Sequence, residues 1–344
     1  MTEPRFFKPE NNENAEEFIK CLPLGVQTSF TMMAPAIATA ELLRVRPMIG
    51  DSLFERAATY YASHEAEDAT LKQLVALLQM TVVRLACWDS FDEIAVMMTD
   101  AGISDNQGEK RAYRYQADAL KNTLQRQGYE YLNKVLEFCT ENVSELPEFE
   151  RSQYYTTRQN SLIHSMADFE KHISIGGDFC VFAKLREWIE QTEAMELEFR
   201  IGTGLKTALL EHGTYEGSSS GASDSEAENR LRPIIRSVAA FVAHWSMSEA
   251  APFLNLIPTA QGLMVVSEES RQGGNVMNGA NKEQVATFTQ HHREAAERYI
   301  GQVVTYCKRH VDTFPEIEEI GMESDTEHGA DLIDNHGHKT FLVL

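Results

Sequence analysis

The sequence predicts a mainly α-helical protein built by tandem duplication of a four-helix unit, with a small β-hairpin inserted between helices 3 and 4 of each copy. Three observations predict this. Apolar residues recur at the three- and four-residue spacing of helices, the first half of the chain matches the second, and the gaps between matching stretches fall in segments with loop composition. The 344 residues suffice for two such units.

The matching residues of the two halves lie at offsets that grow along the chain from 152 to 157, 160 and 168. The pairs include Phe30–Phe182, Glu41–Glu193, Trp88–Trp245, Gly102–Gly262 and Cys139–Cys307. The offset grows within 213–228, between Trp245 and Gly262, and near 271–281, where Gly, Ser, Asn or Pro are frequent and insertions are tolerated. Duplication is therefore favoured over two unrelated helical domains that share a periodicity.

Each helix of the first repeat is predicted from its apolar spacing and its end signals. The first helix ends at Gly50, and Ser52–Glu55 has the form of a capping box that begins the second. The third carries one apolar stripe, and the fourth is long and ends before Pro147, because proline disfavours helix in the residue before it. The expected spans are about 30–41, 52–61, 71–85 and 113–139.

The segments between the third and fourth helices have turn residues flanked by short apolar runs, at 96–104 and 256–267. The second copy favours a β-hairpin because its residues from Leu263 to Val266 are good strand formers. Residues 151–181 bridge the halves, with Leu162 and Ile163 beginning the second bundle. The expected organisation is an N-terminal arm, a first repeat, a second repeat and an acidic tail, at 1–14, 15–155, 156–318 and 319–344.

The composition excludes several classes of protein. With 31 basic and 52 acidic residues, the net charge of −21 argues against tight nucleic-acid binding over the whole surface. No run of 18 apolar residues suggests a membrane-spanning helix, and the first ten residues lack the apolar region of a signal peptide. The five cysteines show no C-x-x-C spacing, so we expect buried thiols in a soluble, intracellular protein.

The sequence predicts no catalytic, cofactor-binding or metal-binding residue, and therefore no enzyme. His291 and His292 are interpreted as part of a solvated helix surface, and Gly202-Thr203-Gly204 as a helix break instead of a phosphate-binding loop. Trp88 and Trp245 are expected to be core residues. The tail histidines His328, His336 and His338 stand beside glycines and are not expected to form a preorganised metal site.

The tail has the composition of a tethered docking peptide. Residues 316–334 contain eight acidic residues and no Lys or Arg, and the apolar stretch Phe341–Leu344 follows. A frayed terminus is an equally favoured interpretation, and the polar arm 1–14 is a second candidate contact. The candidate partner-docking residues are Leu263, Val265, Val266, Phe341, Leu342, Val343 and Leu344.

Several of these segments also carry a resemblance to a known group of proteins. They are Phe30–Gly50, Gly102–Ser104, Leu146–Ser152, Leu162–Phe169 and Phe182–Gly202. In them the chain resembles an uncharacterised all-helical family encoded in the structural-gene blocks of tailed phages and prophages of gut bacteria, crAss-like phages included. The resemblance covers roughly residues 15–320, rests on hydrophobic and structural motifs, and brings no catalytic residues.

The resemblance implies a structural virion protein of the neck, a head-to-tail connector whose copies form a ring that continues the DNA channel of the portal. The implied partners are other copies of the chain, the portal protein, the next neck or tail component, and DNA that passes without specific binding. No cofactor and no membrane are implied, and the protein would reside in the host bacterial cytoplasm during assembly. An intracellular helical scaffold or regulator that binds a partner peptide is the alternative, and an enzyme with an unrecognised polar cleft is a third possibility.

Overall fold

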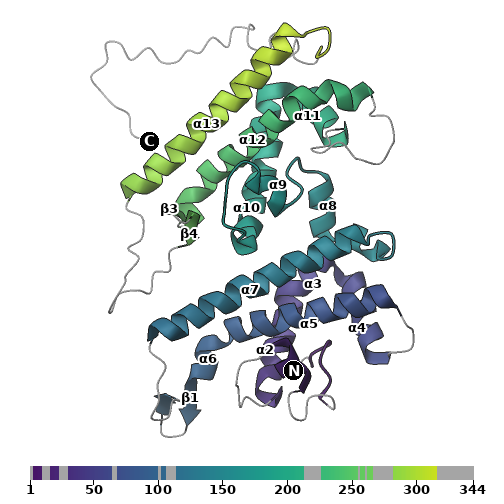
Figure 1. Ribbon diagram of the computed structural model, residues 1–344, viewed down its shortest axis with the longest axis vertical. Helices are drawn as coiled ribbons and strands as arrows, with labels where there is room; N and C mark the ends of the chain where they lie inside the picture. Colours follow the sequence, from purple (N-terminus) through teal and green to yellow (C-terminus); the bar gives the residue numbers. More distant parts are fainter. Residues whose placement is uncertain are drawn as a thin grey trace, which may run out of the picture. The chain divides into compact units, whose positions relative to one another are not determined.

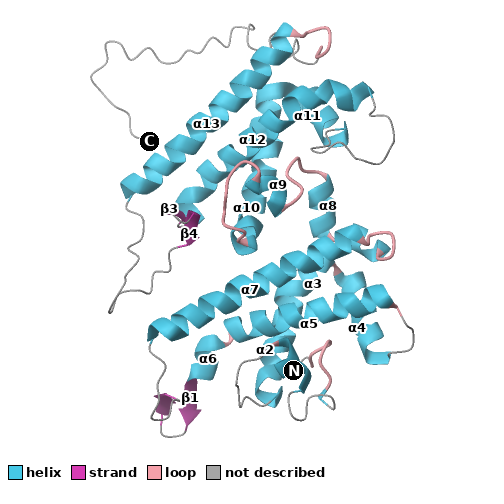
Figure 2. Cartoon of the chain, viewed as in Figure 1, coloured by secondary structure: helices cyan, strands magenta, loops and turns pink. Residues whose placement is uncertain are grey.

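A computed structural model describes ten stretches of the chain. The contacts within the chain divide it into two compact units. Unit 1 comprises Met1–Asn160 with Gly177–Ala183, and unit 2 comprises Ser161–Gly176 with Lys184–Leu344. The described residues are 3–9, 16–22, 30–63, 68–99, 102–105, 114–212, 226–254, 256–259, 262–265 and 282–315. Figures 1 and 2 show that helices dominate both units.

In unit 1 the long helices α5 and α7 lie side by side and form the centre of the fold (Figure 1). A short π-helix, η2, follows α2 directly, and Gly50 adopts a φ of 84° that ends the next helix, as the sequence predicts. The helices are α1 (Glu16–Cys21), α2 (Phe30–Ala40), η2 (Glu41–Val45), α3 (Arg46–Ile49), α4 (Asp51–Ser63), α5 (Ala69–Asp89), α6 (Phe91–Ala95), α7 (Arg114–Glu141), the 3₁₀ helix η3 (Pro147–Arg151) and α8 (Gln153–Gln159).

Unit 2 repeats this order around the helix pair α12 and α13. A π-helix, η4, again follows the first long helix, and Gly202, the counterpart of Gly50, again has a positive φ, 79°, at a kink. The helices are α9 (Met166–Glu170), α10 (Phe179–Gln191, of which residues up to Ala183 belong to unit 1), η4 (Thr192–Leu197), α11 (Glu198–His212), α12 (Glu226–Leu254) and α13 (Lys282–Arg309). The predicted mainly helical, duplicated architecture is therefore confirmed.

In each unit, one short antiparallel strand pair precedes the last long helix. In unit 1, β1 (Val96–Thr99) pairs with β2 (Gly102–Asp105), and in unit 2, β3 (Leu256–Thr259) pairs with β4 (Gly262–Val265). The two registers correspond, because Thr99 faces Gly102 and Thr259 faces Gly262. Of the candidate docking residues, Leu263 and Val265 lie on β4, where only the backbone is described. Val266 and 341–344 lie outside the described residues.

The secondary structure differs from the sequence prediction in its subdivision. The predicted first helix ends as an α-helix at Ala40 and continues as the π-helix η2 and the short helix α3. The short helices α1, α6 and α8 were not predicted, because each is too short to show a clear periodicity.

The helix α5 has the length and apolar composition of a membrane span. Its most apolar 18-residue window is 61 % buried inside the protein, and it packs against α7, α2 and α4. Core helices of soluble proteins share these properties, so α5 gives weak support for a membrane location.

Candidate functional site

The first residue of the π-helix in unit 1, Glu41, holds a segment of chain that precedes the bundle. Its carboxylate accepts the backbone N–H of Arg5 at 2.7 Å and that of Phe6 at 3.0 Å, one on each oxygen. The Glu41 side chain is only 1 % exposed. A carboxylate is acceptor-only when ionised, so two adjacent N–H groups are suitable partners for it.

The segment that Glu41 holds packs into unit 1 through its two phenylalanines, whereas Glu3, Arg5 and Pro9 are exposed. Phe6 and Phe7 are fully buried, and the Phe6 ring meets the Phe54 ring edge-on at 5.1 Å between centroids. The Gln79 side-chain amide donates to the Phe6 carbonyl at 2.8 Å, and Lys8 N–H donates to the Tyr61 hydroxyl at 3.1 Å. The predicted N-terminal arm is therefore, in residues 5–8, a peptide docked on the bundle.

Unit 2 has the same arrangement at the matching glutamate. Glu193 lies in the π-helix η4, is 4 % exposed, and accepts the Leu162 N–H at 2.8 Å. The Ser161 hydroxyl donates to the same carboxylate oxygen at 3.0 Å. Leu162 and Ile163 are buried, as predicted for the start of the second bundle. We call Glu41 and Glu193, each with the apolar residues that surround the held segment, the two segment-binding sites.

Burial governs the electrostatics of both sites. It raises the pKa of Glu41 to about 7, against the lowering effect of the Arg5 and Phe6 N–H groups. It likewise raises the pKa of Glu193 to about 7, against the effects of the Leu162 N–H and the Ser161 hydroxyl. Loss of hydration therefore outweighs the hydrogen bonds in both units, and both carboxyl groups change charge near neutral pH.

An exposed apolar side chain lies two residues after each buried glutamate. Leu43 is 69 % exposed and Met195 is 65 % exposed, and the two are equivalent in the duplication. The π-helix thus carries a buried acceptor on one side and an apolar residue in solvent on the other in each unit. Short π-helical insertions of this type are frequent at functional sites.

The interior of unit 2 contains a histidine pair that corrects one prediction. His292 is 7 % exposed, not part of a solvated surface, and its Nδ1 lies 2.8 Å from Nδ1 of His244. Burial lowers the pKa of His244 to about 3 and that of His292 to about 4, and neighbouring histidines add to both effects. Two neutral rings, one donating and one accepting, satisfy this geometry. Within the described residues, no group of three His, Cys, Asp or Glu side chains could hold a metal ion.

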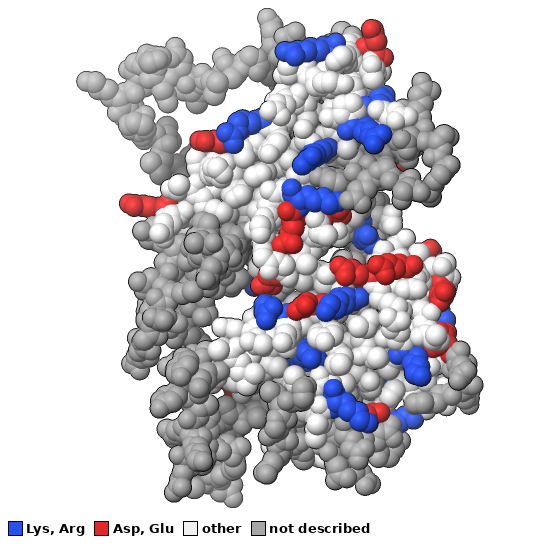
Figure 3. Space-filling view, in the orientation of Figure 1, with Lys and Arg blue, Asp and Glu red and all other residues white. Residues whose placement is uncertain are grey.

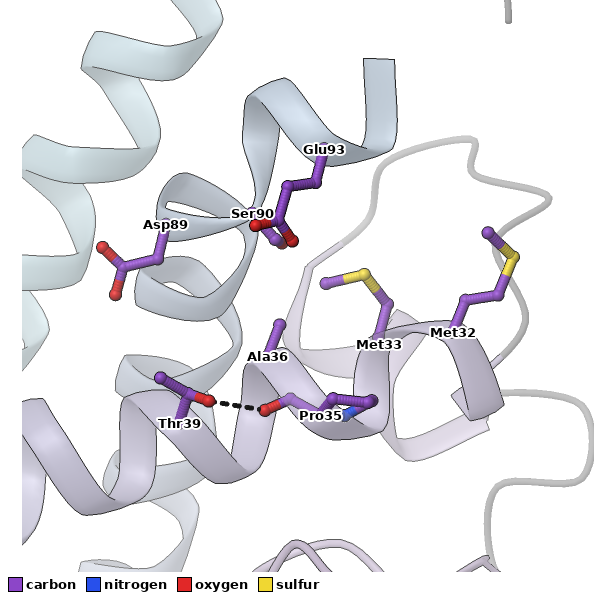
Figure 4. A pocket seen from close by; sticks show the side chains of 8 residues that line it. All are labelled: Met32, Met33, Pro35, Ala36, Thr39, Asp89, Ser90 and Glu93. Atoms are coloured by element: carbon purple, nitrogen blue, oxygen red, sulfur yellow. Dashed lines mark hydrogen bonds between the residues drawn. The ribbon is translucent and has the colours of Figure 1, made fainter. Parts of the chain in front are cut away.

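A shallow pocket of about 360 Å³ opens in unit 1 between α2 and the junction of α5 and α6 (Figure 4). One side is apolar, from Met32, Met33, Pro35 and Ala36, and the opposite edge carries Asp89, Ser90 and Glu93. The Thr39 hydroxyl donates a hydrogen bond to the Pro35 carbonyl at 2.9 Å. This combination suits a basic side chain with an apolar stem, because the stem can bury while the charge meets Glu93, although Asp89 already pairs with Arg44 at 3.0 Å.

The two tryptophans and the cysteines behave largely as predicted. Trp245 is 6 % exposed and has the Arg293 guanidinium 3.8 Å from its ring centre, whereas the half-buried Trp88 has the Arg44 guanidinium at 5.3 Å. All five cysteines are buried thiols, none of them in a disulfide. The signal for the segment-binding sites was present in the sequence, since Glu41 and Glu193 match each other on otherwise apolar helix faces, but nothing in the pattern showed what they bind.

The duplication is independently visible in a comparison with known families. A family of unknown function, DUF6712, matches residues 45–159 and matches again at 203–321. The chain belongs to this family. The first match runs from the end of η2 past α7 to the end of α8, and the second runs from within α11 past the end of α13, so Glu41 and Glu193 lie outside both matches. Neither curated proteins nor solved structures gave a match.

Proposed function

We propose that this chain is a structural assembly protein, a head-to-tail connector of a tailed phage whose copies form a ring in the neck and continue the DNA channel of the portal. The observation that carries the proposal is the pair of segment-binding sites. In each unit a non-helical segment that precedes the bundle donates two hydrogen bonds to a buried glutamate. Closure of a ring requires contacts between unlike faces of one subunit, which an arm that binds a neighbouring copy can supply.

The proposal includes an ancestral unit of four helices with a hairpin between the last two, copied once. The π-helices place an exposed apolar residue, Leu43 or Met195, at the same point of each unit. The resemblance to the phage family, through residues such as Ile49-Gly50 and Ile201-Gly202, supports the same interpretation. No catalytic step is part of the proposed function.

The charge distribution supports a role beside DNA without tight binding. On the face seen in Figure 3, Lys and Arg are interspersed with Asp and Glu over the described residues. A surface of this kind offers no continuous basic track for the phosphate backbone. The net charge of −21 adds a general repulsion that would let DNA slide past.

Solution sizing tests the proposal. Purified chain is mixed with purified portal protein, and the mass of the complex is measured by light scattering after size exclusion. A complex containing several copies of the chain per portal is the expected result. Free chain and free portal eluting separately, under conditions in which the portal itself is assembled, would overturn it.

The second candidate is an intracellular scaffold or regulator that binds a partner peptide. The pocket between α2 and the α5–α6 junction favours it, because apolar and acidic sides face each other there. This candidate predicts a free monomer or dimer that captures a basic peptide without any virion component. Asp89→Asn together with Glu93→Gln would then weaken peptide binding, and would leave portal association unchanged.

A further inference from the structure

The two segment-binding sites accept the same three-residue pattern. The first residue donates a hydrogen bond to the glutamate, from the backbone in Arg5 and from the hydroxyl in Ser161. The second donates its backbone N–H, at 3.0 Å for Phe6 and 2.8 Å for Leu162. The second and third residues in each case bury large apolar side chains. The pattern is therefore a hydrogen-bond donor followed by two large apolar residues, in a segment outside the helices.

The source of the held segment differs between the units. In unit 2 it is the stretch that leaves unit 1, since Ser161 follows the end of α8 at Gln159 by two residues. The site in unit 2 thus holds the chain that arrives from the preceding unit. In an assembly of copies, the unit that precedes unit 1 is unit 2 of another copy, and the stretch that leaves it begins after Pro315.

That stretch contains the same pattern once more. Thr340-Phe341-Leu342 offers a hydroxyl followed by two large apolar residues, as Ser161-Leu162-Ile163 does, and it places a phenylalanine where unit 1 now holds Phe6. The preceding Lys339 is basic. At the Glu41 site, Arg5 pairs with Glu55 at 2.8 Å on the protein surface, and Arg46 also lies 3.6 Å from Glu55. Lys339, one position before the residue that matches Arg5, offers a basic side chain to the same carboxylate.

The distance along the chain is sufficient for contact with a second copy. Thr340 lies 25 residues beyond Pro315, which in extended chain spans at most about 80 Å. The eight acidic residues of 316–334 repel one another and favour an extended spacer.

We propose that Thr340-Phe341-Leu342 of one copy binds the Glu41 site of a second copy, in the place that Arg5-Phe6-Phe7 occupies within a single chain. The Thr340 hydroxyl and the Phe341 N–H donate to the Glu41 carboxylate, and Phe341 and Leu342 fill the positions of Phe6 and Phe7. The chain's own arm is then the local competitor that limits self-association. The inference rests on the proposed function only in that copies of the chain meet.

The first test uses the full chain with its arm weakened. Phe6→Ala removes the larger part of the arm's apolar contact, and its fold is checked by circular dichroism. We expect the self-association of this variant, measured by light scattering over a concentration series, to tighten at least about tenfold relative to the unmodified chain. Adding Phe341→Asp should abolish the gain, whereas Leu332→Asp, the same change of charge in the same tail, should not.

The second test identifies the binding site. A labelled peptide of residues 338–344 is titrated into the full chain carrying Phe6→Ala and Phe341→Asp, and anisotropy is recorded. Binding should weaken at least about tenfold for a Phe341→Asp peptide, and competition by a peptide of residues 2–9 should displace the probe. The proposal is wrong if Phe341→Asp and Leu332→Asp change the self-association of the Phe6→Ala chain equally. It is also wrong if the peptide of residues 2–9 does not displace the labelled peptide.

Self-association that survives Phe341→Asp would point to exchange of the N-terminal arm between copies and would also overturn it. These outcomes are separate from the proposed function. Portal association that is unaffected by Phe341→Asp leaves the connector role standing without this contact. Self-association that depends on the tail, without portal binding, would support this contact and contradict the connector role.

Discussion

The two units of this protein keep one feature and vary another. Both have a buried glutamate at a π-helix that holds a segment of chain, followed by a pair of buried apolar residues, Phe6-Phe7 in unit 1 and Leu162-Ile163 in unit 2. The interior of the central helix pair differs, since Cys87 and Leu124 of unit 1 correspond to His244 and His292 of unit 2. The two units are therefore more alike at the buried glutamate than in the packing of their long helices.

The pH dependence of stability should separate the units most strongly. Glu41 has its pKa raised from 4.5 to about 7 on folding, so between these values the folded state binds more protons than the unfolded state. Unit 1 should therefore lose about 3 kcal/mol as pH rises through that range. Amide-exchange free energies of α5 and α7, corrected for intrinsic rates, measure this loss.

Unit 2 should respond differently because it contains opposing groups. Glu193 contributes the same fall with rising pH, but burial lowers the pKa of His172 and His292 to about 4 and that of His244 to about 3. These histidines bind more protons when unfolded, so their contribution rises with pH up to about 6.5. The exchange free energies of α12 and α13 should fall less than those of unit 1, or rise, between pH 4.5 and 6.5. Parallel curves for both units would contradict this account of their interiors.

The two glutamates should differ in their tolerance of a neutral amide. Glu41 uses both carboxylate oxygens for N–H groups, so Glu41→Gln sets an NH₂ against one N–H and should destabilise unit 1 by about 1–3 kcal/mol. Glu193 receives the Leu162 N–H and the Ser161 hydroxyl on one oxygen, which the amide oxygen can replace. Glu193→Gln should cost less than about 1 kcal/mol. Denaturant unfolding at pH 8, where both carboxyl groups are mostly ionised in the folded protein, compares them, and an equal cost would show that the oxygen geometry does not matter.

Exchanging the interior residues tests whether unit 2 can replace its buried histidine pair by the residues of unit 1 and still fold. His244→Cys with His292→Leu places the unit 1 residues in unit 2. At pH 5 the change should stabilise unit 2 by about 1–2 kcal/mol, because histidines that must stay neutral when buried are removed. The gain should shrink towards pH 7.5. Thermal unfolding at both pH values gives the comparison, with Cys87→Ala in unit 1 as a control that should show no such dependence on pH.

A smaller effect is expected where the long helices of unit 1 come closest. A Cβ on Gly128 would lie 2.6 Å from Leu85 Cδ2. In unit 2 the equivalent pair is Ala296 and Val242, a larger residue on one helix and a smaller one on the other. Gly128→Ala should cost about 1 kcal/mol, partly offset by its helix propensity. Adding Leu85→Val should restore the lost stability, because it makes room for the new Cβ. A double-mutant cycle that shows no coupling between the two substitutions would contradict the equivalence of this pair with Ala296 and Val242.

Much of the fold could be read from the sequence because it depends on periodic signals. The stripe from Leu71 to Leu85 marks α5, and the breaks at Gly50 and Gly202 appear where expected. The π-helices could not be predicted, since an insertion of one residue barely alters an apolar pattern. The fate of Phe6 and Phe7 was also hidden, because a two-residue apolar run carries no periodicity. His292 was misread because its partner His244 is 48 residues away on another helix.

The most direct test of the account is the exchange of the amides that the two glutamates hold. Glu41→Ala and Glu193→Ala are compared by residue-resolved amide exchange in the full chain. The account predicts that the Arg5 and Phe6 amides lose protection only in Glu41→Ala, and that the Leu162 amide loses it only in Glu193→Ala. Unchanged protection of these amides in both variants would contradict it, because the segments would then be held by something other than the buried carboxylates.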